Sequence, residues 1–262
     1  MDHGIPGLLL STVLLRPYVF TFLFIYLLAA SLKIGVRKTA IFTLVGWSFA
    51  YVSEFSSIRN GFPFGLYYYI PSTVGRELWV FGVPFMDSLS FTFLAYASWG
   101  TARVFVSPSE GVGTGFRFRE GVKDPFSWDT VLLGAILFML IDVVIDPLAL
   151  RGDRWFLGKI YYYPTPGPYF GVTLENFLGW FFVGLVTLSL WGAINRRMGR
   201  GLADEGRAFA DLLGPALYYI VLVFNIYMTF RIGEHDLAWA GIFIFLPVTA
   251  LLAARLFRLY QP

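Results

Sequence analysis

Long apolar runs recur along the whole 262-residue chain, separated by short polar or glycine- and proline-rich segments. Each run is about 20 residues long, which is the length an α-helix needs to cross the hydrocarbon core of a bilayer. Seven runs are predicted to span a membrane: residues 10–32, 39–57, 81–104, 128–149, 172–194, 208–230 and 238–258. The pattern therefore predicts an all-α fold, a polytopic transmembrane helical bundle, and leaves no apolar run for a soluble domain.

The composition supports a membrane protein and narrows the chemistry. The chain is 57% hydrophobic and only 14% charged, which is rare for a soluble domain. It contains no cysteine, so disulfides and thiolate chemistry are excluded. Its two histidines argue against a histidine-based metal or haem site. We therefore expect one integral-membrane domain over residues 1–262, without a cofactor or bound metal.

The loops alternate in charge, and this alternation predicts the orientation in the cell membrane. One set of loops and helix ends holds 13 of the 20 lysines and arginines: Lys33, Arg37, Lys38, Arg103, Arg117, Arg119, Lys123, Arg196, Arg197, Arg200, Arg207, Arg255 and Arg258. The positive-inside rule then places the N-terminus outside and the C-terminus in the cytoplasm. The glycine-rich segment 105–127 is expected to be a flexible cytoplasmic linker. The basic pI of about 9.1 reflects these loops and does not indicate a nucleic-acid partner.

Five acidic residues fall at membrane depth, all in the half of the bilayer predicted to be outer: Glu54, Asp87, Asp142, Asp146 and Glu175. A carboxylate in hydrocarbon is costly, so such residues usually mark a functional site. Asp142 and Asp146 are one helical turn apart and share a helix face. The clustering predicts one polar cavity that contains all five acids.

An internal repeat supports this cavity. Glu54 is followed five residues later by Arg59, and Asp146 by Arg151; each pair then leads to a Tyr-Tyr-Tyr and a Phe-Gly-Val. The repeat predicts two units, 39–104 and 128–194, related by an axis along the membrane normal. The two aromatic loops, NGFPFGLYYYIP and GKIYYYPTPGPYFG, are expected either to form an interfacial belt or to fold back over the acids.

Each acid also has a structural interpretation. Arg59 and Arg151 are placed to pair with Glu54 and Asp146. Glu175, which lies beside Asn176 at a helix start, is placed to cap that helix. Asp142 has no cation near it in the sequence, so a structural role explains it least well.

Several of these segments resemble the integral-membrane carotenoid biosynthesis family, which includes carotenoid 1,2-hydratases and bisanhydrobacterioruberin hydratases. The similarity lies in DVVIDPLALRGDRW, in YFGVTLENFLGW, and in the NGFPFG segment that follows Glu54 and Arg59 and begins at Asn60. The strongest signal is Asp146-Pro147 followed by Asn176, Phe177, Gly179 and Trp180. Thr173 stands where the family pattern has proline, and a second tryptophan expected soon after Trp155 is missing. The resemblance implies an isoprenoid substrate taken from membrane lipid.

Hydrating the terminal alkene of an acyclic carotenoid requires an acid that is neutral until it acts, a carboxylate that holds water, and surfaces that tolerate a cation. Two acids one turn apart resist ionising together, so Asp142 or Asp146 is the predicted proton donor. Asp87, Glu54 or Glu175 would hold the water. The remaining predicted substrate-binding residues are Asn60, Arg59, Tyr67, Tyr68, Trp155, Tyr161, Tyr162, Asn176 and Trp180.

Three other functions fit parts of the sequence. The Asp142-x-x-x-Asp146 spacing is similar to Mg²⁺-diphosphate motifs of membrane prenyltransferases, although a second aspartate-rich motif is missing. Repeats with membrane-depth acids also occur in proton-coupled transporters. A carotenoid-binding protein would retain the polyene unchanged. The hydratase remains the interpretation that uses most of the motifs.

Overall fold

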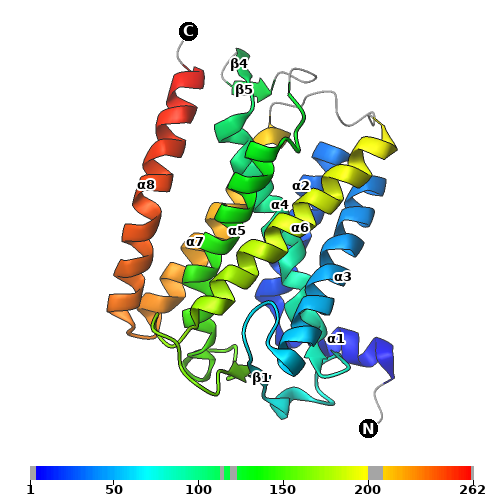
Figure 1. Ribbon diagram of the computed structural model, residues 1–262, viewed down its shortest axis with the longest axis vertical. Helices are drawn as coiled ribbons and strands as arrows, with labels where there is room; N and C mark the ends of the chain where they lie inside the picture. The colour runs from blue at the N-terminus through cyan, green and yellow to red at the C-terminus, as the bar shows by residue number, and fades with distance from the viewer. Residues whose placement is uncertain (1–3, 113–114, 119–122, 200–208, 261–262) are drawn as a thin grey trace.

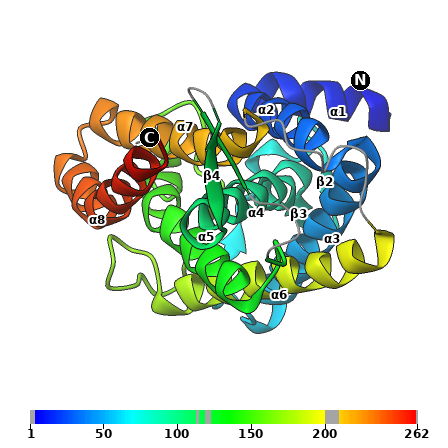
Figure 2. The same ribbon diagram turned by 90° about the horizontal axis from the view of Figure 1, so that it is seen from above.

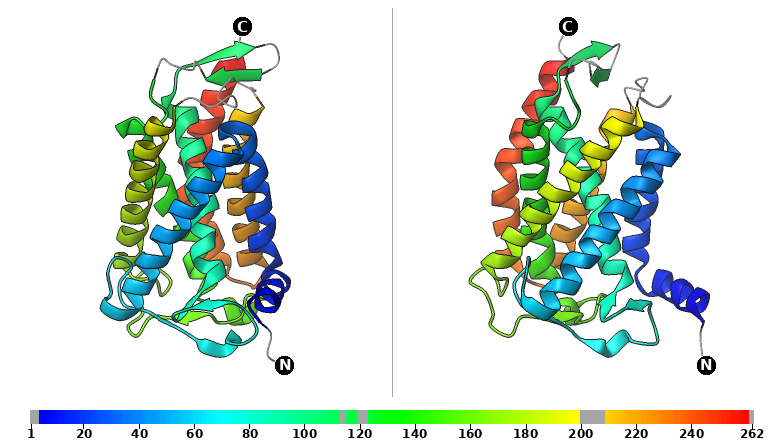
Figure 3. Two further views of the ribbon diagram at one scale, coloured as in Figure 1. Left: turned by 90° about the vertical axis from the view of Figure 1, so that its right-hand side faces the viewer. Right: turned by 45° about the vertical axis from the view of Figure 1, so that its right-hand side comes forward.

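The computed structural model describes residues 4–112, 115–118, 123–199 and 209–260, and these residues form eight α-helices (Figure 1). The helices are α1 (Ile5–Leu15), α2 (Pro17–Ile34), α3 (Val36–Asn60), α4 (Phe85–Val106), α5 (Trp128–Ala149), α6 (Leu174–Met198), α7 (Ala210–Arg231) and α8 (His235–Tyr260). Helices α2 to α8 run side by side as a bundle, with the N-terminus at one end and the C-terminus at the other (Figure 3). The predicted all-α bundle is confirmed.

Five of the bundle helices are long and apolar enough to cross a membrane by length and composition: α2, α5, α6, α7 and α8. Helices α3 and α4 are equally long but less apolar, so five of the seven predicted spans meet this criterion. The position of α4 explains its lower apolarity. It lies among α2, α3, α5 and α7 and is buried over most of its length (Figure 2). A helix surrounded by protein does not need an apolar face toward lipid.

Two glycines allow α4 to approach α7 closely. A Cβ atom on Gly100 would lie 2.9 Å from the Cα atom of Gly214, so the two backbones touch at this crossing. Small residues at helix crossings allow van der Waals contact between backbones, and such contact is a main source of helix association in lipid. This crossing fixes α4 in the centre of the bundle.

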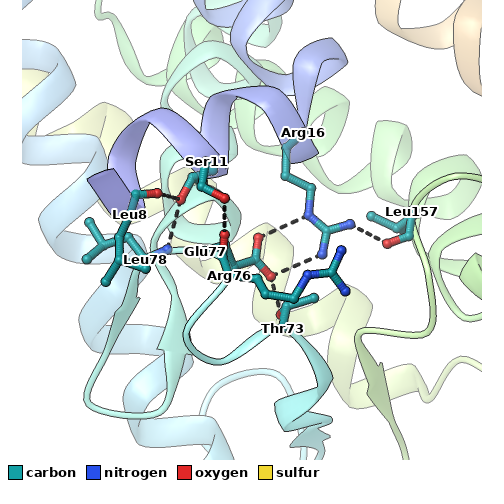
Figure 4. Close-up of polar contacts among 9 residues, drawn as sticks. Leu8, Ser11, Arg16, Thr73, Arg76, Glu77, Leu78 and Leu157 are labelled. Carbon is teal, nitrogen blue, oxygen red and sulfur yellow. Dashed lines mark hydrogen bonds and ion pairs between the residues drawn. The ribbon is translucent and has the colours of Figure 1, made fainter. Parts of the chain in front are cut away.

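The first predicted span, 10–32, is divided at Arg16 into α1 and α2, and α1 projects across the end of the bundle (Figure 3). Arg16 is 1% exposed and donates two 3.1 Å hydrogen bonds to the Glu77 carboxylate (Figure 4). It also donates to the backbone oxygen of Leu157, while Thr73 donates to Glu77. Pro17, the first residue of α2, accounts for the break, because the residue before a proline is disfavoured in a helix. The buried arginine then joins the start of α2 to the loop before α4 and to the loop after α5.

Short antiparallel strand pairs occur in the loops. Strands β1 (Tyr68–Tyr69) and β6 (Tyr161–Tyr162) pair with each other, as do β2 (Trp79–Val80) with β3 (Val83–Pro84) and β4 (Ser109–Val112) with β5 (Gly115–Phe118). Single turns of 3₁₀-helix occupy Pro71–Thr73 and Gly152–Arg154. The predicted linker 105–127 thus contains a hairpin, at the end of the bundle opposite β1 (Figure 1). Arg119, Arg200 and Arg207 of the predicted cytoplasmic set lie outside the described residues.

The two arginines that follow the membrane-depth acids make matching contacts. Arg59 donates to the backbone oxygens of Phe55 and Phe81, at 2.9 and 3.3 Å. Arg151 donates to those of Pro147 and Phe170, at 2.9 and 3.1 Å. Both phenylalanines that follow the Tyr triples have positive φ angles, 46° at Phe81 and 49° at Phe170. Each arginine therefore links the end of its own helix to the Phe-Gly-Val segment that follows the aromatic loop.

Candidate active site

The two aromatic loops meet over one end of the bundle, where α3 and α5 end and α4 and α6 begin. Their β1–β6 pairing places Tyr68 opposite Tyr162 and Tyr69 opposite Tyr161. Successive side chains of a strand point to opposite faces. Tyr68 and Tyr162 are accordingly 40% and 44% exposed, whereas Tyr161 is buried. One face of this two-stranded ribbon therefore covers the helix ends.

A partly open cavity lies beneath the ribbon. Its polar wall consists of three acids, four tyrosines, a serine and an amide: Glu54, Asp87, Asp146, Tyr67, Tyr69, Tyr161, Tyr163, Ser90 and Asn176. Its apolar wall consists of Phe64, Phe91, Leu94, Ile145, Ala149, Ile160 and Trp180. The cavity thus joins carboxyl groups to a largely hydrocarbon and aromatic surface.

Tyr69 connects the two acids of the first half of the chain. Its hydroxyl oxygen lies 2.9 Å from Glu54 Oε1 and 2.6 Å from Asp87 Oδ2. Ser88 donates to the other oxygen of Glu54. Burial, and then the neighbouring carboxyl groups, raise the pKa of Tyr69 well above its usual value, so it stays protonated. A hydroxyl has one proton, so Tyr69 donates to one acid, and the other hydrogen bond forms when the second acid carries a proton.

Asp146 is the centre of hydrogen bonding in the second half of the chain. It accepts from the hydroxyl of Tyr161 at 2.7 Å and from that of Tyr163 at 3.0 Å. The Nδ2 group of Asn176 donates to it at 2.8 Å and to Asp142 at 2.7 Å. All three partners of this carboxyl group are donors, so both of its oxygens are hydrogen-bonded without a proton of its own.

Asp142 lies one layer behind the cavity wall. It is completely buried, and its Oδ2 accepts the bond from Asn176. Its Oδ1 is buried and has no hydrogen-bond partner among the described residues. Asp142 does not line the cavity, so it contacts a substrate there only through Asn176 or Asp146.

Stacked aromatic rings form the base of the cavity. Trp180 stacks on Phe91 with ring centroids 4.3 Å apart, and Phe64 lies 5.7 Å from Phe91. Gly179 makes this arrangement possible, because a Cβ atom there would lie 2.6 Å from Phe64 Cδ1 and 2.6 Å from the backbone oxygen of Pro63. Aromatic faces stabilise a nearby cation, by more when water is excluded.

The structure brings most of the predicted site residues together. Four of the five predicted acids meet here: Glu54, Asp87 and Asp146 line the cavity, and Asp142 joins them through Asn176. Tyr67, Tyr161, Asn176 and Trp180 also line it. Trp155 lines a neighbouring cavity, and its indole nitrogen donates to the backbone oxygen of Leu148 at 3.2 Å.

Other predicted residues lie away from the cavity. Glu175 is exposed at the start of α6, because the side chain that turns inward there is its neighbour Asn176. Arg59 is exposed and stacks 3.4 Å above the Phe55 ring, so it does not pair with Glu54. Asn60 accepts a 2.9 Å bond from the Phe62 backbone and closes the turn after α3.

The remaining differences follow from the ribbon. Tyr68 and Tyr162 face outward, so the prediction that they line the cavity is wrong. Tyr69 and Tyr163 line it instead, and sequence reasoning missed both. The period-two alternation of a strand was the signal that would have selected the first and third tyrosine of each triple. Arg151 pairs with Glu234 at 3.0 Å instead of with Asp146.

Comparison with known proteins identifies the family of the chain. The sequence profile of the carotenoid biosynthesis protein family matches residues 11–251, so the chain belongs to that family. Membership gives the protein a role in carotenoid biosynthesis and agrees with the resemblance seen in the sequence. Searches of curated proteins and of solved structures gave no match.

Proposed function

We propose that this protein is a membrane hydratase that adds water to the terminal C=C bond of an acyclic carotenoid. The observation that supports this most is the cavity in which Glu54, Asp87 and Asp146 face the stacked rings of Phe91 and Trp180. Membership of a carotenoid biosynthesis family supports the substrate class. The reaction needs only acid, base, water and a surface that tolerates a cation.

The steps balance without an oxidant or reductant. A carboxylic acid transfers its proton to the less substituted alkene carbon, and the other carbon becomes a tertiary cation. The oxygen of a water molecule bonds to this cation, and the water then loses a proton to a carboxylate. One hydrogen and one hydroxyl are added in total. The protein must therefore hold one carboxyl group protonated and another ionised within the same cavity.

The Glu54–Tyr69–Asp87 group is the proposed proton donor. Tyr69 has one proton for two carboxyl oxygens at 2.9 and 2.6 Å, so the arrangement is satisfied when Glu54 or Asp87 is protonated. Asp146 is the proposed base, because its three hydrogen-bond partners are all donors and satisfy both of its oxygens without a proton of its own. This reverses the sequence-based assignment, which placed the donor at Asp142 or Asp146. Asp142 and Asn176 become positioning residues for Asp146.

The aromatic base of the cavity is the proposed stabiliser of the cation. Phe64, Phe91 and Trp180 present ring surfaces beside the acids. Each such face contributes roughly 0.5–2 kcal/mol when the site is dry. These contacts are strongest in the transition state and for the cation, which is the condition for accelerating the reaction rather than only binding the substrate.

In the membrane, we propose seven spans, with α3 and α4 crossing beside the five apolar helices. The N-terminus and the cavity would face the outside, and the C-terminus the cytoplasm. We also propose that α3–α4 and α5–α6 are two copies of one unit. The matching contacts of Arg59 and Arg151, and the mutual pairing of the two tyrosine triples, support this repeat.

The hydrogen-bond donors around the paired aspartates favour the hydratase over a prenyltransferase. Asp142 and Asp146 both accept from Asn176 Nδ2, and Asp146 also accepts from two tyrosines. Amide and phenol protons occupy both oxygens of Asp146 and one oxygen of Asp142, which a Mg²⁺-diphosphate motif would offer to the metal. Groups of this kind instead hold a carboxylate for proton transfer.

The test is expression in a host that makes acyclic carotenoids, followed by mass spectrometry of the extracted pigments. We expect a product heavier by one water from the unmodified chain. Asp146→Asn should lower product by roughly 10²–10⁴-fold, the usual contribution of a general acid or base. Glu175→Gln is the matched control, because this acid is exposed away from the cavity. Unchanged pigment with the intact chain, or full activity in Asp146→Asn, would contradict the proposal.

A further inference from the structure

A second, partly open cavity adjoins the first one. Six residues line both, which makes the two spaces neighbours through a common wall: Asp87, Ser90, Leu94, Ile145, Ala149 and Ile160. The second cavity extends from this wall between α2, α4, α5 and α7. Its other lining residues are Tyr18, Val19, Phe22, Met86, Phe93, Trp155, Leu157, Val221 and Asn225.

The chemistry of this second cavity changes along its length. Away from the common wall its lining is almost entirely hydrocarbon and aromatic. Asn225 is the amide in that part, and its Nδ2 group already donates to the Val221 backbone oxygen at 2.8 Å. Asp87 lies at the common wall, where it also bonds Tyr69. A ligand that fits must therefore be apolar along its length and reach the carboxyl groups with one end.

The Phe224 ring contacts the wall of the second cavity and also lies on the outer surface of α7. Phe224 stacks on Tyr18 with centroids 5.6 Å apart and meets Phe22 edge-on at 5.4 Å, and both partners line the second cavity. Phe224 itself lines an open apolar groove on α7 together with Val223 and Tyr227. Those two side chains are exposed, on a helix apolar enough to cross a membrane.

We propose that the second cavity binds the hydrocarbon chain of an acyclic isoprenoid, behind the end that reacts in the first cavity. The chain reaches it from lipid along the α7 groove, past Phe224. The inference rests on the proposed function for the nature of the reacting end. It goes further by assigning a binding site for the unreactive part of the substrate and a route from the bilayer.

The test fills the second cavity without altering the first. Val221 is 2% exposed and lines only the second cavity, so Val221→Phe places a ring in it. Val19→Phe does the same from α2 and serves if the first variant does not fold. Val52→Phe is the matched control, because Val52 is 57% exposed on α3. Purified full-length variants are given a long acyclic polyene, or a short acyclic isoprenoid alkene with the same trisubstituted end.

We expect Val221→Phe to lower both the polyene retained on the protein, measured by its absorbance, and its conversion. Each should fall by about tenfold or more, because the new ring occupies space that the hydrocarbon chain needs. Conversion of the short alkene, which needs only the first cavity, should stay within about twofold. If folded Val221→Phe retains and converts as much polyene as Val52→Phe does, the inference is overturned.

The two proposals fail in different ways. If the unmodified protein hydrates neither substrate but retains the polyene, and Val221→Phe abolishes that retention, the hydratase proposal is wrong and the binding site stands. If all variants hydrate both substrates equally, the binding site is wrong and the hydratase stands. The route is tested separately with Phe224→Trp, which should slow polyene transfer from vesicles, whereas Phe243→Trp on the exposed side of α8 should not.

Discussion

Replacing Tyr69 by phenylalanine removes one oxygen atom from the cavity and keeps the ring. That oxygen lies between Glu54 Oε1, at 2.9 Å, and Asp87 Oδ2, at 2.6 Å. Its removal leaves two carboxyl groups facing a gap in an environment where unsatisfied polar groups are costly. Glu54 keeps its bond from Ser88, so Asp87 is the more affected acid.

The size of the effect follows from the bonds that are lost. Hydrogen bonds that involve a charged group contribute roughly 1.5–3 kcal/mol each. If the proton held between these acids is the one transferred to substrate, the loss acts directly on the reaction. With 1.4 kcal/mol for each factor of ten, we expect the hydration rate of Tyr69→Phe to fall roughly 10- to 100-fold.

The assay compares Tyr69→Phe with Tyr68→Phe in the same carotenoid-producing host and after purification. Tyr68 is the neighbouring residue, bears the same hydroxyl, and is 40% exposed on the outer face of the ribbon. The control should match the unmodified protein in amount, thermal stability and rate. A Tyr69→Phe variant that folds and hydrates at the unmodified rate would refute the idea that this hydroxyl helps to hold the transferred proton.

Three further changes test the site and its support. Gly179→Ala should displace Phe64 from the cavity, because the new Cβ would lie 2.6 Å from the Phe64 ring. We expect thermal unfolding to show a stability loss of about 1–3 kcal/mol, and a higher KM to show weaker substrate binding. Arg16→Met should destabilise the fold by about 3–5 kcal/mol, because Glu77 would keep a buried charge without its cation. The double variant Arg16→Met/Glu77→Gln should recover much of this stability in the same unfolding assay. Asn176→Leu removes the donor shared by Asp142 and Asp146, and its hydration rate should fall at least tenfold while polyene retention persists.

Hydrophobic periodicity was sufficient to predict the bundle and the common location of four acids. Apolar runs of membrane length and carboxyl groups at one depth are properties of single segments, so they can be read without knowing how the segments pack. The sequence-based prediction was wrong where contacts between distant segments determine the structure. Arg16 falls inside the predicted span 10–32, but in the structure it lies between two helices and forms an ion pair with Glu77. Glu77 contributes to the fold from a loop 61 residues later.

The choice of side chains within the site was less predictable for a related reason. Glu175 and Asn176 are adjacent, and only the rotation of α6 about its axis decides which one faces the cavity. The same applies to the tyrosine triples, where pairing between two distant loops sets which rings turn inward. Neither the rotation of a helix nor the register of a strand pair is fixed by local sequence alone.

The hydrogen bonds to the acids that line the first cavity are divided between the two halves of the chain. Glu54 and Asp87 are bonded by Tyr69 and Ser88, whereas Asp146 is bonded by residues that all follow it in the sequence. During biosynthesis, α3 and α4 can therefore enter the bilayer with their carboxyl groups already satisfied, before the later helices are translated. We expect a gene split between β5 and α5 to yield two co-expressed fragments that assemble into a working protein. Burying the acids of the first cavity would then not require the two halves to be made as one continuous chain.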